Sequence, residues 1–170
     1  MNWPLLAGAL VSGPGLVVFY YLMALSKGSP QKRLGESFKM PDVRLRYTPD
    51  TLYDTFAMAG EAGRPEMLRY WLYDFGLIVC LMAVMIAVSA NVVGKGTWLF
   101  TLMVWLTAVR TAADIAEDLL FLSLLRRYPA RRDGMARLAS LTTTLKHTLL
   151  IAWLLPLFFK LVLAAFNIRL

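Results

Sequence analysis

Four long stretches of apolar residues alternate with polar links along this chain of 170 residues. They cover about residues 3–25, 70–93, 98–125 and 138–166. A helix needs about 20 apolar residues to cross the hydrocarbon core of a bilayer, so each stretch is long enough to span it. The pattern therefore predicts an all-α fold, a four-helix transmembrane bundle that forms a single integral membrane domain over residues 1–170.

The first polar link, residues 26–69, contains a further helix signal. Its first part, through Pro41, is rich in Gly, Ser, Lys and Pro and predicts irregular chain. Thr48-Pro49-Asp50 then has the residue types of an N-cap and a first helical turn. Apolar residues recur at helical spacing up to Gly60, which supplies a stop. We predict a short amphipathic helix over 49–59, which either lies on the membrane surface or caps the bundle.

Composition agrees with a membrane protein. The chain is 58% apolar and only 17% charged, with a mean hydropathy of +0.57, whereas soluble domains average nearer a quarter charged. The single cysteine, Cys80, excludes an internal disulfide and argues against a cysteine-ligated metal site. We expect no metal and no cofactor.

The net charge of +7 is concentrated in two links. Residues 26–69 carry eight Lys or Arg and residues 126–137 carry five, whereas the link between the second and third stretches carries only Lys95. The positive-inside rule places the two basic links in the cytoplasm or mitochondrial matrix and both termini on the opposite side. We expect a bacterial or mitochondrial inner membrane and no nucleic-acid partner. Anionic lipid head groups are expected at Lys32, Arg33, Arg126, Arg127, Arg131 and Arg132.

One charged helix face is the main candidate for function. Arg110, Asp114, Glu117 and Asp118 are spaced i, i+4, i+7, i+8, so they share a face inside the third apolar stretch. Charges within a bilayer are costly and usually face a protein interior or a wet cavity. Asp74, Lys146 and His147 fall at a similar depth in the neighbouring stretches, which predicts an intramembrane polar network of these seven residues.

Such a network has three interpretations. It can be an ion network that locks three helices together, which we favour, a ligand or proton site, or a metal or catalytic site. An Asp-x-x-Glu pair is common by chance, and His147 lacks the spacing of a metal-binding pair. A face that closes on Lys146 and Arg110 indicates a structural role, and one that opens to a cavity indicates a ligand or catalytic role.

Several motifs resemble a group of small four-span membrane proteins found in bacterial genomes and without assigned function. The motifs are Arg46-Tyr47-Thr48-Pro49-Asp50 with Leu52-Tyr53, Gly60-x-x-Gly63-Arg64, Tyr70 with Asp74, Asp114-x-x-Glu117-Asp118, Arg127-Tyr128-Pro129, and Arg137-Leu-Ala-Ser with Lys146. Where that group is expected to have Glu-Asn, this chain has Glu117-Asp118, which adds an acid. The resemblance supports the architecture and the importance of the acidic face, and it implies no activity.

The sequence contains no nucleophile motif, nucleotide-binding loop or haem-ligating histidine pair. Our leading hypothesis is therefore a non-catalytic accessory or scaffolding subunit that binds lipid and a larger membrane protein complex, or that forms a homo-oligomer. The first alternative is an intramembrane enzyme or carrier for a lipophilic molecule that uses the acidic face. The second is proton or cation handling at that face.

Overall fold

The protein folds into long α-helices, in agreement with the predicted all-α class. The structure is a computed structural model that describes residues 3–35 and 38–166, with side chains for 12–27, 32, 34–35, 38–163 and 166. Within that part there is no strand. The elements are α1 (Trp3–Leu34), the short 3-10 helix η1 (Pro41–Val43), α2 (Pro49–Val92), α3 (Trp98–Arg127) and α4 (Asp133–Ala165).

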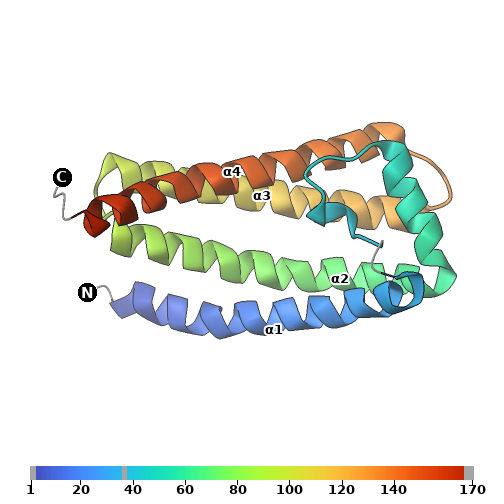
Figure 1. Cartoon of the computed structure of the whole chain (residues 1–170), viewed down its shortest axis with the longest axis horizontal. Coiled ribbons are helices and arrows are strands. Elements are labelled where there is room, and N and C mark those ends of the chain that lie inside the picture. Colours follow the sequence, from blue (N-terminus) through green and yellow to red (C-terminus); the bar gives the residue numbers. More distant parts are fainter. Residues whose placement is uncertain (1–2, 36–37, 167–170) are drawn as a thin grey trace.

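The helices lie lengthwise beside one another (Figure 1). α1 packs along α2, α2 also packs on α3, and α3 packs on α4. The start of α1 and the end of α4 lie at one end of the bundle, together with the 93–97 turn between α2 and α3 (Figure 1). We call this the hairpin end. Residues 38–60 fold across the opposite end, which we call the link end.

Three of the described helices are long and apolar enough to cross a membrane. They are α2, α3 and the part of α4 over Asp133–Leu163. The fourth predicted span, about residues 3–25, falls in α1, where the side chains of residues 3–11 lie outside the described part. The integral membrane character therefore rests on three candidate spans, which the turn at 93–97 and the link at 128–132 join in antiparallel order.

The first link differs from the prediction in its first part. α1 continues to Leu34, so the expectation of irregular chain was wrong for residues 26–34. Local polarity and small residues there did not stop a helix that is already propagating, because adding a residue to a formed helix is much easier than starting one. α1 ends at Gly35, whose φ of 81° is a conformation that suits glycine.

The start of α2 agrees with the predicted helix signal. Thr48 is the N-cap, and its hydroxyl accepts a hydrogen bond from the Thr51 amide at 3.2 Å, with Pro49 as the first helical residue. α2 is interrupted at Gly60, which has φ 65° and ψ −174°. That region of the backbone map is open essentially only to glycine. The chain turns there, and the segment 49–59 leaves the direction of the rest of α2 (Figure 1).

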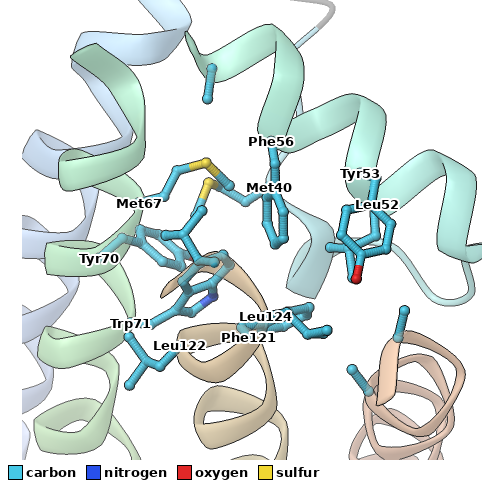
Figure 2. Packing of buried hydrophobic residues seen from close by; sticks show 14 of the residues in the cluster. Met40, Leu52, Tyr53, Phe56, Met67, Tyr70, Trp71, Phe121, Leu122 and Leu124 are labelled. Carbon is cyan, nitrogen blue, oxygen red and sulfur yellow. The ribbon is translucent and has the colours of Figure 1, made fainter. Parts of the chain in front are cut away.

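The 49–59 segment caps the link end of the bundle. Its apolar face contributes Leu52, Tyr53 and Phe56 to a buried core cluster with residues of α2 and α3 (Figure 2). At the centre of that cluster, Trp71 and Phe121 stack with ring centroids 4.7 Å apart. Burial of these rings ties the link to the helices and favours capping over a free position on the membrane surface.

A second apolar cluster lies toward the hairpin end. It is made of Met85, Val93, Met103 and Trp153. The indole N–H of Trp153 donates a hydrogen bond to Ser89 Oγ at 3.0 Å, which satisfies both groups within α2 and α4. Along each of the three spanning helices, the polar residues singled out above lie between the two apolar clusters.

Candidate ligand-binding cavity

Asp114 is the centre of a buried ion network. Arg110 Nη2 lies 2.7 Å from Asp114 Oδ2, one helical turn away on α3. Lys146 Nζ, on α4, donates a hydrogen bond to Asp114 Oδ1 at 2.7 Å and also forms an ion pair with Glu117. All four side chains are buried. Of the seven residues predicted for the polar network, these four are joined by ion pairs, which connect α3 to α4.

Glu117 has a second partner that the sequence did not indicate. Its Oε1 contacts the hydroxyl of Thr143, which is also 2.8 Å from the Ala139 carbonyl and 3.4 Å from the hydroxyl of Tyr47. Because a threonine hydroxyl has one proton, it can donate to only one of these oxygens at a time. Burial raises the pKa of Tyr47, which lies in the first link, so its hydroxyl keeps its proton at neutral pH.

Asp118 is buried without a partner. Its side chain is 0% exposed, and neither carboxylate oxygen has a hydrogen bond within the described part of the chain. It lies one turn along α3 from Asp114, and it interacts electrostatically with Asp74 on α2. A buried carboxyl without hydrogen bonds is costly, so Asp118 contributes nothing to the ion network that holds α3 to α4.

Asp74 is the second acid outside the ion network. It is 5% exposed, and it makes no hydrogen bond or ion pair with any residue that the structure describes. Its carboxyl group borders a cavity between the helices. The sequence predicted that Asp74 would join the polar layer, and the structure places it beside that layer, facing open space.

Asp42 is a site residue that sequence reasoning missed. It lies in η1, far along the chain from the acids of α2 and α3 described above, and it is 7% exposed. Tyr70 donates a hydrogen bond from its hydroxyl to Asp42 Oδ2 at 2.8 Å, whereas Oδ1 has no partner among the described residues. Burial raises the pKa of Asp42, against the opposing effects of the Lys146 charge and the Tyr70 hydrogen bond. No pattern in the irregular link could have placed this acid at the cavity.

The cavity has a volume of about 200 Å³ and is bordered by all four helices and η1. At ~30 Å³ per molecule, that is room for about six or seven waters or one small polar head group. The polar wall is formed by Asp42, Tyr70, Asp74, Arg110, Asp114, Lys146 and His147. The apolar wall and rim are formed by Tyr20, Met23, Leu77, Ile78 and Leu81.

Two residues of the polar wall keep free hydrogen-bonding capacity. Arg110 uses one guanidinium nitrogen on Asp114, and its Nε and Nη1 have no partner among the described residues. His147 is half-buried, and its Nδ1 lies 2.8 Å from the Thr143 carbonyl. Since a carbonyl only accepts, Nδ1 carries the proton of that hydrogen bond.

The residues predicted to meet lipid head groups lie at the link end. Arg131 pairs with Asp133 at 3.2 Å and with Asp50, so it holds the start of α2 to the link before α4. Arg126 borders a surface groove that also contains Arg64 and Arg69. The side chains of Lys32, Arg127 and Arg132 are exposed, and that of Arg33 lies outside the described part.

No group of three or more His, Cys, Asp or Glu side chains in the described part is placed to hold a metal ion. No protein-family model, curated protein or solved structure matches the chain. What the site can do must therefore be argued from its own geometry, which combines a closed ion network with an open acidic cavity.

Proposed function

We propose that this protein binds a lipophilic small molecule in the cavity beside Asp74, as a carrier of that molecule or as an enzyme acting on it. The observation that supports this proposal is Asp74 itself, an acidic residue that is 5% exposed, has no hydrogen-bond or ion-pair partner among the described residues and borders the cavity. A buried charge without a partner is expensive. A ligand that enters the cavity would supply the missing partner.

A purely structural role accounts for only part of the polar layer. Arg110, Asp114, Glu117 and Lys146 are joined by ion pairs and can lock α3 to α4. Asp74 takes no part in that network, although two cations lie on the same cavity wall. An acid kept in a membrane span without strengthening the fold is a candidate for function.

Passage of protons or cations across the membrane is less well supported. Between α2, α3 and α4, the hairpin end is filled by Met85, Val93, Met103 and Trp153. These side chains offer no ionisable relay from the acidic cavity toward the hairpin end through the described parts of these three helices. Binding from one side fits this geometry better than conduction.

The membrane arrangement that we propose has four spans, with α1 as the fourth. α1 runs the length of α2, and the apolar residues 3–25 would place it in the same bilayer. The excess of Lys and Arg in the two links at the link end supports a cytoplasmic or matrix location for that end. Labelling of Lys95→Cys and Arg132→Cys variants from each side of sealed vesicles tests this, because the two cysteines should react from opposite sides.

The binding proposal is tested by purifying the full chain from its native membrane in a mild detergent. Mass spectrometry of the extracted small molecules should find one lipophilic compound in stoichiometric amount with the wild-type chain. Asp74→Asn should carry much less of it, whereas Asp54→Asn should carry the normal amount, because Asp54 is exposed on the 49–59 segment.

The same preparation separates this proposal from an accessory subunit. A set of larger membrane proteins in fixed ratio, with no small molecule that depends on Asp74, would favour the subunit hypothesis and overturn ours. A compound that the wild type, Asp74→Asn and Asp54→Asn retain in equal amounts would indicate lipid bound to the outer surface.

A further inference from the structure

We infer that the ligand of this cavity is an amphiphile with a positively charged amine head, whose ammonium group lies against Asp74 and Asp42. The inference rests on the proposed function and names the chemical class of the molecule. It follows from which charged atoms around the cavity are already paired and which are free.

The two cations of the polar wall, Lys146 and Arg110, already form ion pairs with acids. Lys146 lies between Asp114 and Glu117, and Arg110 is paired with Asp114 at 2.7 Å. The acids outnumber them, because Asp42 and Asp74 also border the cavity, and Asp118 is buried one turn of α3 from Asp114. Of the acids that border the cavity, Asp74 has no hydrogen bond or ion pair with a described residue, and Asp42 Oδ1 has no hydrogen-bond partner there.

The excess of unpaired acids over unpaired cations around the cavity favours a positively charged ligand. An anionic head group placed beside Asp74 would meet an unpaired carboxyl, and like charges at close range in a low-dielectric site repel strongly. A neutral head group would leave Asp74 without a counter-charge. An ammonium group supplies three donors and one positive charge, which matches the Asp74 carboxyl group and the one oxygen of Asp42, Oδ1, that has no described donor.

The apolar residues that line the cavity account for the lipophilic part of the ligand. Met23, Leu77, Ile78 and Leu81 border the same cavity from α1 and α2. An aliphatic chain attached to the amine can therefore leave the polar wall along these side chains toward the bilayer. Arg110 also borders the cavity, and its Nε and Nη1 have no partner among the described residues.

The experiment uses the full chain in maltoside micelles and three probes with one chain length: dodecylamine, dodecanol and dodecanoate. Each is added at the same mole fraction of the micelle, and the melting temperature is followed by circular dichroism. Dodecylamine should raise the melting temperature by roughly 5–10 °C at a hundredfold excess over its Kd. The other two probes should change it by much less.

Variants connect that effect to the cavity. Asp74→Asn should abolish the dodecylamine shift and keep the helical spectrum, because Asp74 forms no hydrogen bond or ion pair with the residues that the structure describes. Asp42→Asn, in the link, should reduce the shift, and Asp54→Asn should keep it. Ethanolamine, which has the head group without the chain, should produce no shift at millimolar concentration if the source is a membrane amphiphile. A shift that depends on Asp74 would instead assign a soluble amine.

Two results would overturn the inference. The first is a larger shift with dodecanol or dodecanoate that is lost in Asp74→Asn, which would leave the binding function in place and change the ligand class. The second is an amine shift of equal size in wild type and Asp74→Asn, which would place the amine on the micelle or on the outer surface. The proposed function itself fails only if native membranes yield no molecule that depends on Asp74.

Discussion

Replacement of Lys146 by methionine is the sharpest test of the ion network. The methionine occupies nearly the space of the lysine stem, so the main change is loss of the ammonium group that pairs with Asp114 and Glu117. Asp114 retains Arg110 at 2.7 Å. Glu117, which is 0% exposed, loses its ion pair with Lys146 and has no other among the described residues.

The loss in free energy of unfolding caused by Lys146→Met has an upper limit, because Glu117 can be protonated. Removal of one partner of a buried pair typically costs about 3–5 kcal/mol. The orphaned carboxyl can instead take up a proton, which for an ordinary glutamate pKa of about 4.3 costs ~3.7 kcal/mol at pH 7 and ~1 kcal/mol at pH 5. We therefore expect Lys146→Met to lower the melting temperature by roughly 8–15 °C at pH 7 and by a few degrees at pH 5.

The assay is thermal unfolding in maltoside micelles, followed by circular dichroism at both pH values. Lys95→Met is the matched control, because Lys95 is exposed in the turn at the hairpin end and has no described partner. Glu117→Gln combined with Lys146→Met should recover most of the loss at pH 7, since no orphaned charge remains. Equal melting temperatures for Lys146→Met and Lys95→Met would refute the reasoning, as would a loss that does not depend on pH.

Three further variants test other parts of the structure by the same assay. Asp118→Asn should not lower the melting temperature and should raise it increasingly with pH, because it removes a buried carboxyl with no hydrogen bond; a clear loss would reveal an undetected partner. Trp71→Ala should cost about 3–5 kcal/mol, against little for the exposed Trp98→Ala, and similar values for both would count against the stacked core. Gly60→Ala should cost about 1–3 kcal/mol through its positive φ, whereas Gly134→Ala, within α4 and with open space around it, should not destabilise; the reverse order would contradict the kink.

The helices were predictable from the sequence because their signals are local. The apolar stretches, the Thr48 cap and the glycines of the 93–97 turn each act on a few neighbouring residues. Gly94 and Gly96 have φ of 88° and 86°, the conformations for which glycine is suited. The continuation of α1 to Leu34 was missed because the composition of a segment says little about a helix that enters it already formed.

The candidate site was predictable only in part, for a different reason. The spacing of Arg110, Asp114 and Glu117 places them on one face, and the depth of Lys146 in the fourth apolar stretch places it in the same layer, where the structure pairs it with Asp114 and Glu117. Spacing cannot show which acids find partners, so the isolation of Asp74 and Asp118 emerged only from the packing. Asp42 reaches the cavity because the link folds back over the end of the bundle, a long-range event with no local signal.

The most direct test of the central claim is a structure of the full chain purified from its native membrane, at a resolution that shows side chains and bound molecules. We predict density that does not belong to the protein within hydrogen-bonding distance of the Asp74 carboxyl, with a tail along Leu77 and Leu81. A closed cavity in which Asp74 pairs directly with Arg110 or Lys146 would contradict the account and return the whole polar layer to a structural role.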